Sequence, residues 1–192
     1  MNLSILDMPR AYTAIAEWLA VMLFALSFPP RQPRRNYAVT ALCALVVQTV
    51  FLVVTDDISL YLWLPCMMMA VGMMLGWLLL LCDISVKEAS YACVRAFILA
   101  EFAAAIEWQI HRFFWPVEDP VWWQQHGLML LVFGGIFLVM WLLEQRSGNP
   151  EQRLVITWHE LLTVCIIGIC VFVFVFGVGR ELLFPTGANI ID

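Results

Sequence analysis

The chain has 192 residues, of which 63% are hydrophobic and 13% are charged, with a formal net charge of −5 and a mean hydropathy of +0.88. Soluble domains contain about 45–50% apolar residues, and a chain of this length could not bury such an excess in one water-soluble core. The acidic balance and the lack of a basic stripe argue against a nucleic acid partner, so the lipid bilayer is the first partner to expect.

Six apolar stretches, each about as long as a membrane-crossing helix, predict an all-α fold. The predicted spans are 10–28, 37–55, 60–82, 89–110, 126–143 and 154–176. We expect a polytopic transmembrane bundle of six helices in which residues 1–192 form one domain. The first ten residues lack the basic start of a signal peptide and are expected to be mature sequence.

The charge of the loops predicts the orientation of the bundle. Most Lys and Arg side chains follow the first, third and fifth spans, at Arg31, Arg34, Arg35, Lys87, Arg146 and Arg153. The opposite side holds Arg10, Arg112 and Arg180 together with acidic residues. Because positively charged loops stay in the cytoplasm, the N-terminus and the C-terminus are both predicted to lie outside.

The first and fourth spans carry ionisable side chains at depths where lipid cannot solvate them. Glu17 interrupts the first span, and Arg95, Glu101 and Glu107 interrupt the fourth, so the fourth helix is expected near the centre of the bundle. At ~1.5 Å per residue, Glu17 and Glu101 lie at a similar depth below the outer surface. Intramembrane carboxyls favour a ligand or substrate site, although charges can also simply lock helices together.

Arg95 requires an acidic partner inside the bundle. Counted along the helices, Arg95 and Glu160 lie at similar depths near the cytoplasmic side, which predicts an Arg95–Glu160 ion pair with His159 beside it. Glu88 and Glu17 are the alternative partners of Arg95. A metal site is not expected, because H-E-x-x-H would need a second His at Thr163 and the chain has no C-x-x-C. No catalytic residue and no cofactor is predicted.

Two further patterns each allow two interpretations. Gly72 and Gly76 form a G-x-x-x-G that serves either internal helix packing or a homodimer seam. Trp115, Trp122 and Trp123 belong to an outer aromatic segment. This segment is either an aromatic belt at the level of the lipid headgroups or the mouth of a pocket for an apolar or peptide ligand.

Several short segments of the chain resemble a known family. They are Pro9 to Tyr12, Glu17-Trp18, Cys82 to Ser85, Arg95 to Phe97, Ala100 to Phe102 and Glu107 to Gln109. With them the chain resembles the membrane sensor region of GHKL-type histidine kinases, bacterial relatives of the agr-type peptide quorum-sensing receptors. The resemblance implies six or seven helices, an external ligand face, and a cytoplasmic kinase module that follows the last helix and is absent from this chain. Because the C-terminus is predicted outside, a further helix would be needed to bring the chain to that module.

The resemblance implies a signal-sensing input domain of a two-component system in the bacterial inner membrane, which is not itself an enzyme. It would bind an extracellular peptide or small apolar ligand. The expected ligand-binding residues are Glu17, Glu101, Glu107, Trp115, Trp122 and Trp123. One alternative is a small transporter or a substrate-binding subunit of a transporter, and a third is an intramembrane enzyme built on Glu17, Glu101 and His159.

Overall fold

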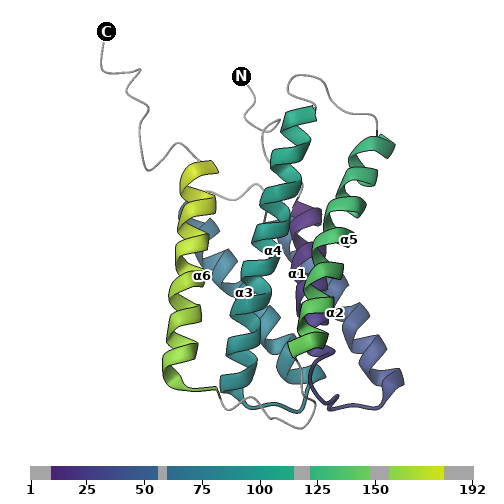
Figure 1. Cartoon of the computed structure of the whole chain (residues 1–192), viewed down its shortest axis with the longest axis vertical. Helices are drawn as coiled ribbons and strands as arrows, with labels where there is room; N and C mark the ends of the chain where they lie inside the picture. The colour runs from purple at the N-terminus through teal and green to yellow at the C-terminus, as the bar shows by residue number, and fades with distance from the viewer. Residues whose placement is uncertain (1–9, 56–59, 115–121, 148–155, 180–192) are drawn as a thin grey trace.

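The computed structural model describes residues 10–55, 60–114, 122–147 and 156–179, and these residues form six α-helices (Figure 1). The helices are α1 Arg10–Ala25, α2 Arg34–Val54, α3 Leu60–Leu81, α4 Val86–Phe114, α5 Trp122–Ser147 and α6 Trp158–Gly179. Each helix coincides with one predicted span, with ends that differ by a few residues. The predicted all-α, six-helix bundle is therefore confirmed.

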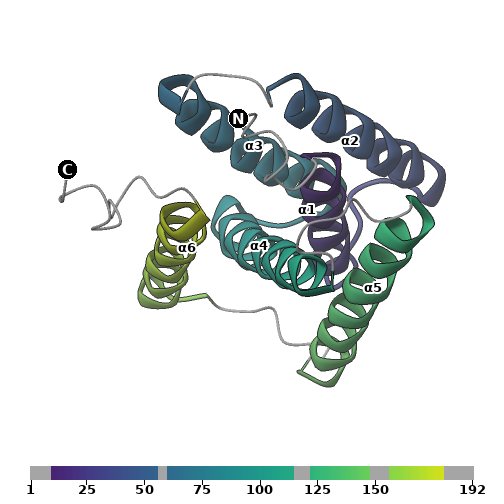
Figure 2. The same ribbon diagram turned by 90° about the horizontal axis from the view of Figure 1, so that it is seen from above.

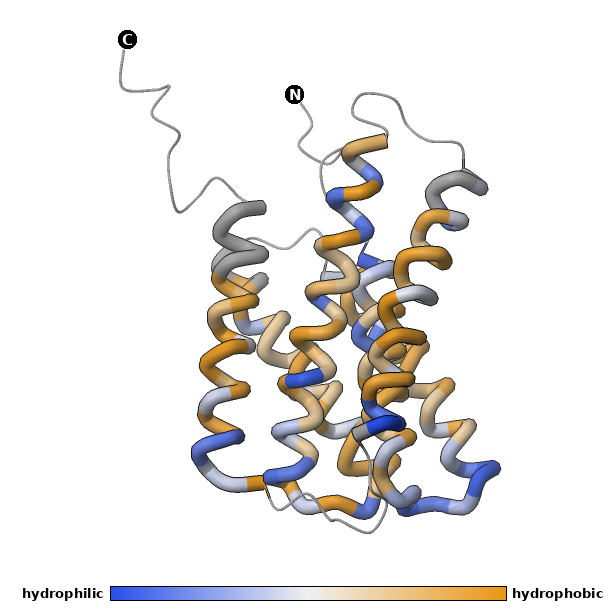
Figure 3. The backbone as a smooth tube through the Cα atoms, in the orientation of Figure 1, coloured by the Kyte–Doolittle hydropathy of each residue, from blue (hydrophilic) through white to orange (hydrophobic). Residues whose placement is uncertain are grey.

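Four of the helices, α2, α3, α4 and α5, contain stretches long and apolar enough to cross a membrane. α6 is apolar over a shorter described stretch, Trp158–Val173. Large apolar side chains remain exposed on the outer faces of these helices, and Figure 3 shows apolar residues along their middle parts with polar residues nearer the lower ends. Exposed apolar surface of this extent requires lipid around it, so the chain is a multi-pass membrane protein.

α1 and α4 form the centre of the bundle (Figure 2). α1 packs against α2, α3, α4 and α5, whereas α4 packs against α1, α3, α5 and α6. Both helices bury alanines completely, namely Ala16 and Ala20 on α1 and Ala96, Ala100 and Ala103 on α4. Small side chains let helix backbones approach closely in lipid, where no hydrophobic driving force brings helices together. The polar fourth helix is therefore central, as its charges predict, and it shares that position with α1.

α4 and α6 begin with the same capping arrangement. Ser85 Oγ accepts a hydrogen bond of 3.3 Å from the backbone N–H of Glu88, and Glu88 Oε2 accepts one of 2.7 Å from the backbone N–H of Ser85. Thr157 and Glu160 repeat both bonds at α6, with the same two lengths. The first N–H groups of a helix have no partner within it, and this reciprocal pair satisfies two donors at once. The pattern Ser/Thr-x-x-Glu thus fixes where both helices start.

The segment between α1 and α2 docks on the C-terminal end of α3. The backbone N–H of Arg31 donates to Leu81 O at 2.9 Å, and the Arg31 guanidinium donates to Leu79 O at 3.1 Å. The side-chain amide of Gln32 donates to Leu80 O at 3.2 Å. The last carbonyls of a helix lack intrahelical partners and attract cations. Arg31, one of the loop cations that predict topology, therefore also caps α3.

Gly72 and Gly76 do not pack against another helix within the described parts of the chain. A methyl group placed on the Cα of either glycine would find no atom within 4 Å. Among the described residues, this G-x-x-x-G therefore has no internal packing partner. The homodimer seam stays a prediction, since these glycines leave the outer face of α3 open to a second helix.

Replacing both Gly72 and Gly76 with Ile is expected to lower the dimer fraction without loss of the fold, because the added side chains meet open space on α3. Native mass spectrometry from lipid nanodiscs at several protein-to-lipid ratios measures that fraction. Gly134→Ile is the matched control, since Gly134 is an exposed glycine on α5 that also has open space around it. An unchanged dimer fraction in the double variant would show that this face of α3 does not form the dimer interface.

Candidate functional site

The buried polar side chains of the described residues lie on α1, α2 and α4. They are Thr13, Glu17, Gln48, Glu101 and Glu107, which we call the polar core. Burying such groups in apolar surroundings is unfavourable unless hydrogen-bond partners replace the lost water. In a membrane-spanning bundle, a set of this kind is the first candidate for a functional site.

Glu17 and Gln48 join α1 to α2 by a hydrogen bond. Gln48 Nε2 donates to Glu17 Oε2 at 2.5 Å, and both side chains are almost completely buried. A carboxylate only accepts hydrogen bonds, so the amide NH₂ group faces Glu17 and the amide oxygen is turned away. Within the described chain, neither Glu17 Oε1 nor Gln48 Oε1 has a hydrogen-bond partner. The pair therefore leaves two acceptors free in the interior.

Glu101 brings α4 to the same region of the bundle. The Glu17 and Glu101 carboxyls interact electrostatically across the interface between α1 and α4, and Arg10 interacts with both. Glu101 Oε1 is buried and has no partner among the described residues. Two carboxyls and one guanidinium thus act on one another at the interface between α1 and α4.

Glu107 lies one to two turns further along α4, where α1 and α5 also meet. Its charge acts on Tyr12 of α1. Tyr12 Oη in turn lies 3.4 Å from His126 Nε2 on α5, and the two rings are arranged edge to face with centroids 5.7 Å apart. The polar core therefore extends towards the end of the bundle at which α4 finishes and α5 begins.

The outer aromatic segment, predicted as a possible mouth of a ligand pocket, lies mostly outside the described residues. We call this predicted mouth the aromatic vestibule. Trp115 lies in the segment 115–121, and the side chain of Trp122 likewise belongs to the part of the chain that is not described. Trp123 is described, on the first turn of α5, and its side chain is 65% exposed. Trp123 therefore does not line the polar core, and a ligand-binding vestibule stays a prediction.

Arg95 pairs with Glu144 of α5, so the predicted pair with Glu160 is wrong. The guanidinium makes two bonds to this carboxylate, Nη2 to Oε2 at 2.8 Å and Nη1 to Oε1 at 3.3 Å, and its Cζ lies 4.5 Å from the centre of the Phe24 ring. Glu160 caps α6, and His159 is exposed beside it. Although Arg95 and Glu160 lie at similar predicted depths, their side chains do not face each other. Arg95 is directed towards α1 and α5, and Glu160 accepts a hydrogen bond from the backbone of Thr157 at the start of its own helix.

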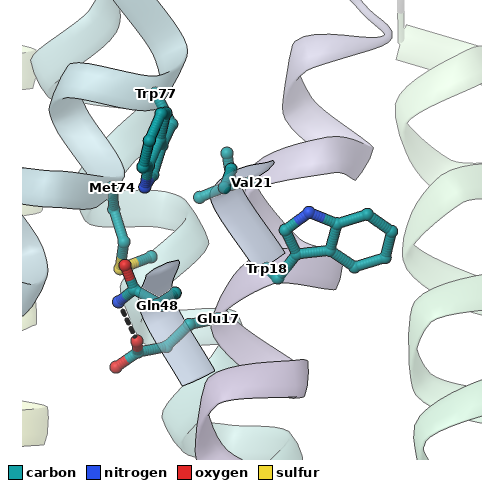
Figure 4. Close-up of a pocket in the computed structure, with 7 residues that line it drawn as sticks. Glu17, Trp18, Val21, Gln48, Met74 and Trp77 are labelled. Carbon is teal, nitrogen blue, oxygen red and sulfur yellow. Dashed lines mark hydrogen bonds between the residues drawn. The ribbon is translucent and has the colours of Figure 1, made fainter. Parts of the chain in front are cut away.

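A small cavity lies between α1, α2 and α3, beside the Glu17–Gln48 pair (Figure 4). Its lining residues are Glu17, Trp18, Val21, Ala44, Gln48, Met74 and Trp77. Pockets for drug-sized ligands measure about 300–1,000 Å³. This cavity holds roughly a single water molecule, so it is not a ready-made site for a peptide or a lipid-like signal.

Sequence reasoning missed two members of this region, Gln48 and Glu144. Gln48 is an amide within an otherwise apolar run from Ala41 to Val54, broken elsewhere only by Thr49, and that isolation was a usable signal of a buried polar contact. Glu144 escaped notice because the predicted fifth span ended at residue 143, one position before it. The structure extends α5 to Ser147 and thereby brings this carboxylate into the bundle.

Comparisons with protein-family models, with curated proteins and with solved structures gave no match. Within the described residues, no group of three or more His, Cys, Asp or Glu side chains is placed to hold a metal ion. The polar core and the helices packed around it are therefore the features of the chain from which a function can be inferred.

Proposed function

We propose that the chain is the membrane-embedded input domain of a bacterial sensor histidine kinase, and that an extracellular peptide or small apolar ligand acts on its polar core. The segments that resemble such kinases contain Glu17, Glu101 and Glu107. All three carboxyls are buried, on the two central helices of the bundle. Buried carboxyls in that position are sensitive to any ligand that changes the distance between α1 and α4, because electrostatic interactions are strong where the dielectric constant is low.

One observation carries this proposal: among the described helices, α4 is the one along which the backbone of α6 packs, and only Phe172 of α6 also reaches a buried cluster of α1, α2 and α3. α4 also carries Glu101 and Glu107, so a shift of α4 at these carboxyls is passed directly to α6. Helix shifts of about 1–2 Å are a common switching motion in packed proteins. A further helix after α6, leading back to a cytoplasmic kinase module, would receive this shift from α6.

Transport is the second candidate, and the electrostatic interaction between the buried carboxyls of Glu17 and Glu101 favours it. Neighbouring carboxyls within a membrane are the usual parts of proton relays. A transporter reconstituted in liposomes would move protons or substrate across the liposome membrane at a rate proportional to the amount of protein. Glu17→Gln would abolish that flux. A sensor would leave the liposomes tight and would instead alter the output of an attached kinase.

Glu101→Gln is expected to change the basal kinase output at least about fivefold, the lower end of usual allosteric coupling. The substitution removes the charge that interacts with Glu17 and Arg10 and keeps the shape of the side chain. The measurement uses the chain joined to its kinase module, with autophosphorylation followed in nanodiscs.

Phe102→Leu is the control, because Phe102 is the next residue on α4 and faces outward. Kinase output that stays unchanged in Glu17→Gln, Glu101→Gln and Glu107→Gln alike would rule out the polar core as the input site.

A further inference from the structure

Polar contacts hold α5 to the centre of the bundle near both of its ends. Towards its C-terminal end, Glu144 pairs with Arg95 of α4. In its second turn, His126 Nε2 lies 3.4 Å from the hydroxyl oxygen of Tyr12 on α1, and the two rings meet edge to face. Tyr12 and His126 are 114 positions apart in the chain, so this contact exists because α1 and α5 pack side by side (Figure 2).

The two contacts of α5 differ in how their charges respond to pH. The guanidinium of Arg95 is charged throughout the physiological pH range. Histidine is the side chain that ordinarily gains or loses its charge between about pH 5 and pH 8. The contact near the C-terminal end of α5 therefore contains a cation of fixed charge, whereas the contact near its start contains a cation that forms only when a proton binds.

The hydrogen bond between Tyr12 and His126 can run in either direction. A neutral imidazole has one donor and one acceptor nitrogen, whereas an imidazolium has two donors. When Nε2 is the acceptor, the Tyr12 hydroxyl donates to it. When Nε2 carries a proton, it donates to Tyr12 Oη, and the hydroxyl proton of Tyr12 is released for another acceptor. Binding of one proton thus reverses this contact without separating the rings.

Glu107 is the acceptor that the fold brings to this place. Its carboxyl is buried on α4 and acts electrostatically on Tyr12. A carboxylate accepts hydrogen bonds and also favours a positive charge nearby. His111, one turn after Glu107 on α4, is stacked on Trp108 of the same helix with ring planes only 5° apart. The titratable groups of α4 that face the start of α5 are thus one carboxyl and a second imidazole.

The charged group that α1 brings to the same end of the bundle is Arg10, two residues before Tyr12. Its charge interacts with the carboxyls of Glu17 and Glu101. A guanidinium opposes a second positive charge in its surroundings, but here two acidic groups compensate it. The carboxyl of Glu107 therefore decides whether a proton on His126 is favoured.

We propose that Tyr12, His126 and Glu107 form a proton-operated latch between α5 and the two central helices. With a neutral His126, Tyr12 donates to the imidazole, and the contact joins α5 to α1 alone. When His126 takes up a proton at Nε2, it donates to Tyr12 Oη, and the Tyr12 hydroxyl donates to the Glu107 carboxyl. The hydrogen bonds then run from α5 through α1 to α4. Protonation draws the start of α5 towards a carboxyl of the polar core, and the inference does not depend on the proposed kinase function.

Nuclear magnetic resonance tests the reversal, using the chain in nanodiscs with ¹⁵N-labelled histidine and with tyrosine ¹³C-labelled at Cζ. His126→Gln and Tyr12→Phe assign the two signals by their loss. We expect the Tyr12 signal to titrate with the midpoint of His126. In Glu107→Gln this midpoint should fall by roughly one pH unit, the lower end of the effect of a neighbouring opposite charge. The exposed His159, at the start of α6, is the control and should keep its midpoint. A Tyr12 signal that does not follow His126 would contradict the latch, as would an unchanged midpoint in Glu107→Gln.

Electron spin resonance tests the movement of α5, with two pairs of labels in a cysteine-free background. Labels at the exposed Val54 of α2 and Trp123 of α5 report on the end that carries the latch. Labels at the exposed Val39 and Leu143 report on the opposite ends of the same two helices. Lowering the pH from about 8 to about 5 should shorten the first distance by about 1–2 Å, the scale of helix shifts in switching proteins, and leave the second unchanged.

Three variants assign this movement to the latch. The change in the first distance should disappear in Tyr12→Phe and in His126→Gln, because neither variant can reverse the contact. His111→Gln is the matched control and should retain the change, since it removes an imidazole from α4 and leaves the contact of α5 intact. The latch is wrong if the native chain shows no change of this distance with pH, or if the change persists in both Tyr12→Phe and His126→Gln.

Discussion

Replacing Arg95 with Ala is expected to lower the free energy of unfolding by roughly 3 kcal/mol, the low end of the range for breaking a buried ion pair. The low end applies because the pair is only partly buried: the side chains of Arg95 and Glu144 are 27% and 17% exposed. The loss includes two charge-assisted hydrogen bonds that join α4 to α5, and the contact of the guanidinium with the ring of Phe24 on α1. Unfolding in mixed micelles with increasing denaturing detergent measures it.

Arg35→Ala is the matched control, since Arg35 is an exposed arginine on the first turn of α2. Surface substitutions of this kind usually change stability by less than about 0.5 kcal/mol. The double variant Arg95→Met, Glu144→Met should recover part of the loss, because it leaves no unpaired charge in the bundle. Equal stability of Arg95→Ala and Arg35→Ala would show that the ion pair contributes nothing.

The positions of the helices were predictable because a bilayer demands long apolar runs, and the loops of this chain interrupt those runs clearly. Each predicted span coincides with a helix even where charges intervene, as at Glu17 and Glu101. The ends were less predictable. The starts of α4 and α6 could have been read from Ser85-x-x-Glu88 and Thr157-x-x-Glu160, since this pattern is local to the sequence.

The partners of the buried charges were not predictable from depth alone. Helical rise gives the height of Arg95 in the membrane, but not which of its neighbours it faces, and the choice between α5 and α6 depends on how three helices rotate against one another. The hydrogen bond between Glu17 and Gln48 was not predictable for the same reason. It depends on the packing of α1 against α2, which the sequence of neither helix specifies by itself.

Gly168→Leu is expected to separate α6 from α4, with the largest effect of any single substitution on α6. A methyl group on the Cα of Gly168 would stand only 2.8 Å from Val94 Cγ1 of α4, and Ile98 closes the same space. Overpacking a well-packed contact costs typically about 1–3 kcal/mol, and a leucine belongs at or above the upper end. α4 is the main described support of α6, although Phe172 still contacts Phe97 with ring centroids 6.1 Å apart and reaches a buried cluster of α1, α2 and α3.

The separation is measured by electron spin resonance between labels at the exposed positions Phe102 of α4 and Ile169 of α6, in a cysteine-free background. Gly168→Leu should lengthen and broaden the distance distribution, whereas Gly135→Leu on α5, where an added side chain meets open space, should leave it unchanged. Gly168→Ala should have a smaller effect, and Val94→Ala should restore it by removing the clashing methyl group. If Val94→Ala fails to rescue Gly168→Ala, the contact does not hold α6 in place. If Val94→Ala does restore the distance, the same two variants can be tested in the chain joined to its kinase module. Kinase output that is lost in Gly168→Ala and recovered in the double variant would show that α6 transmits the signal of the polar core.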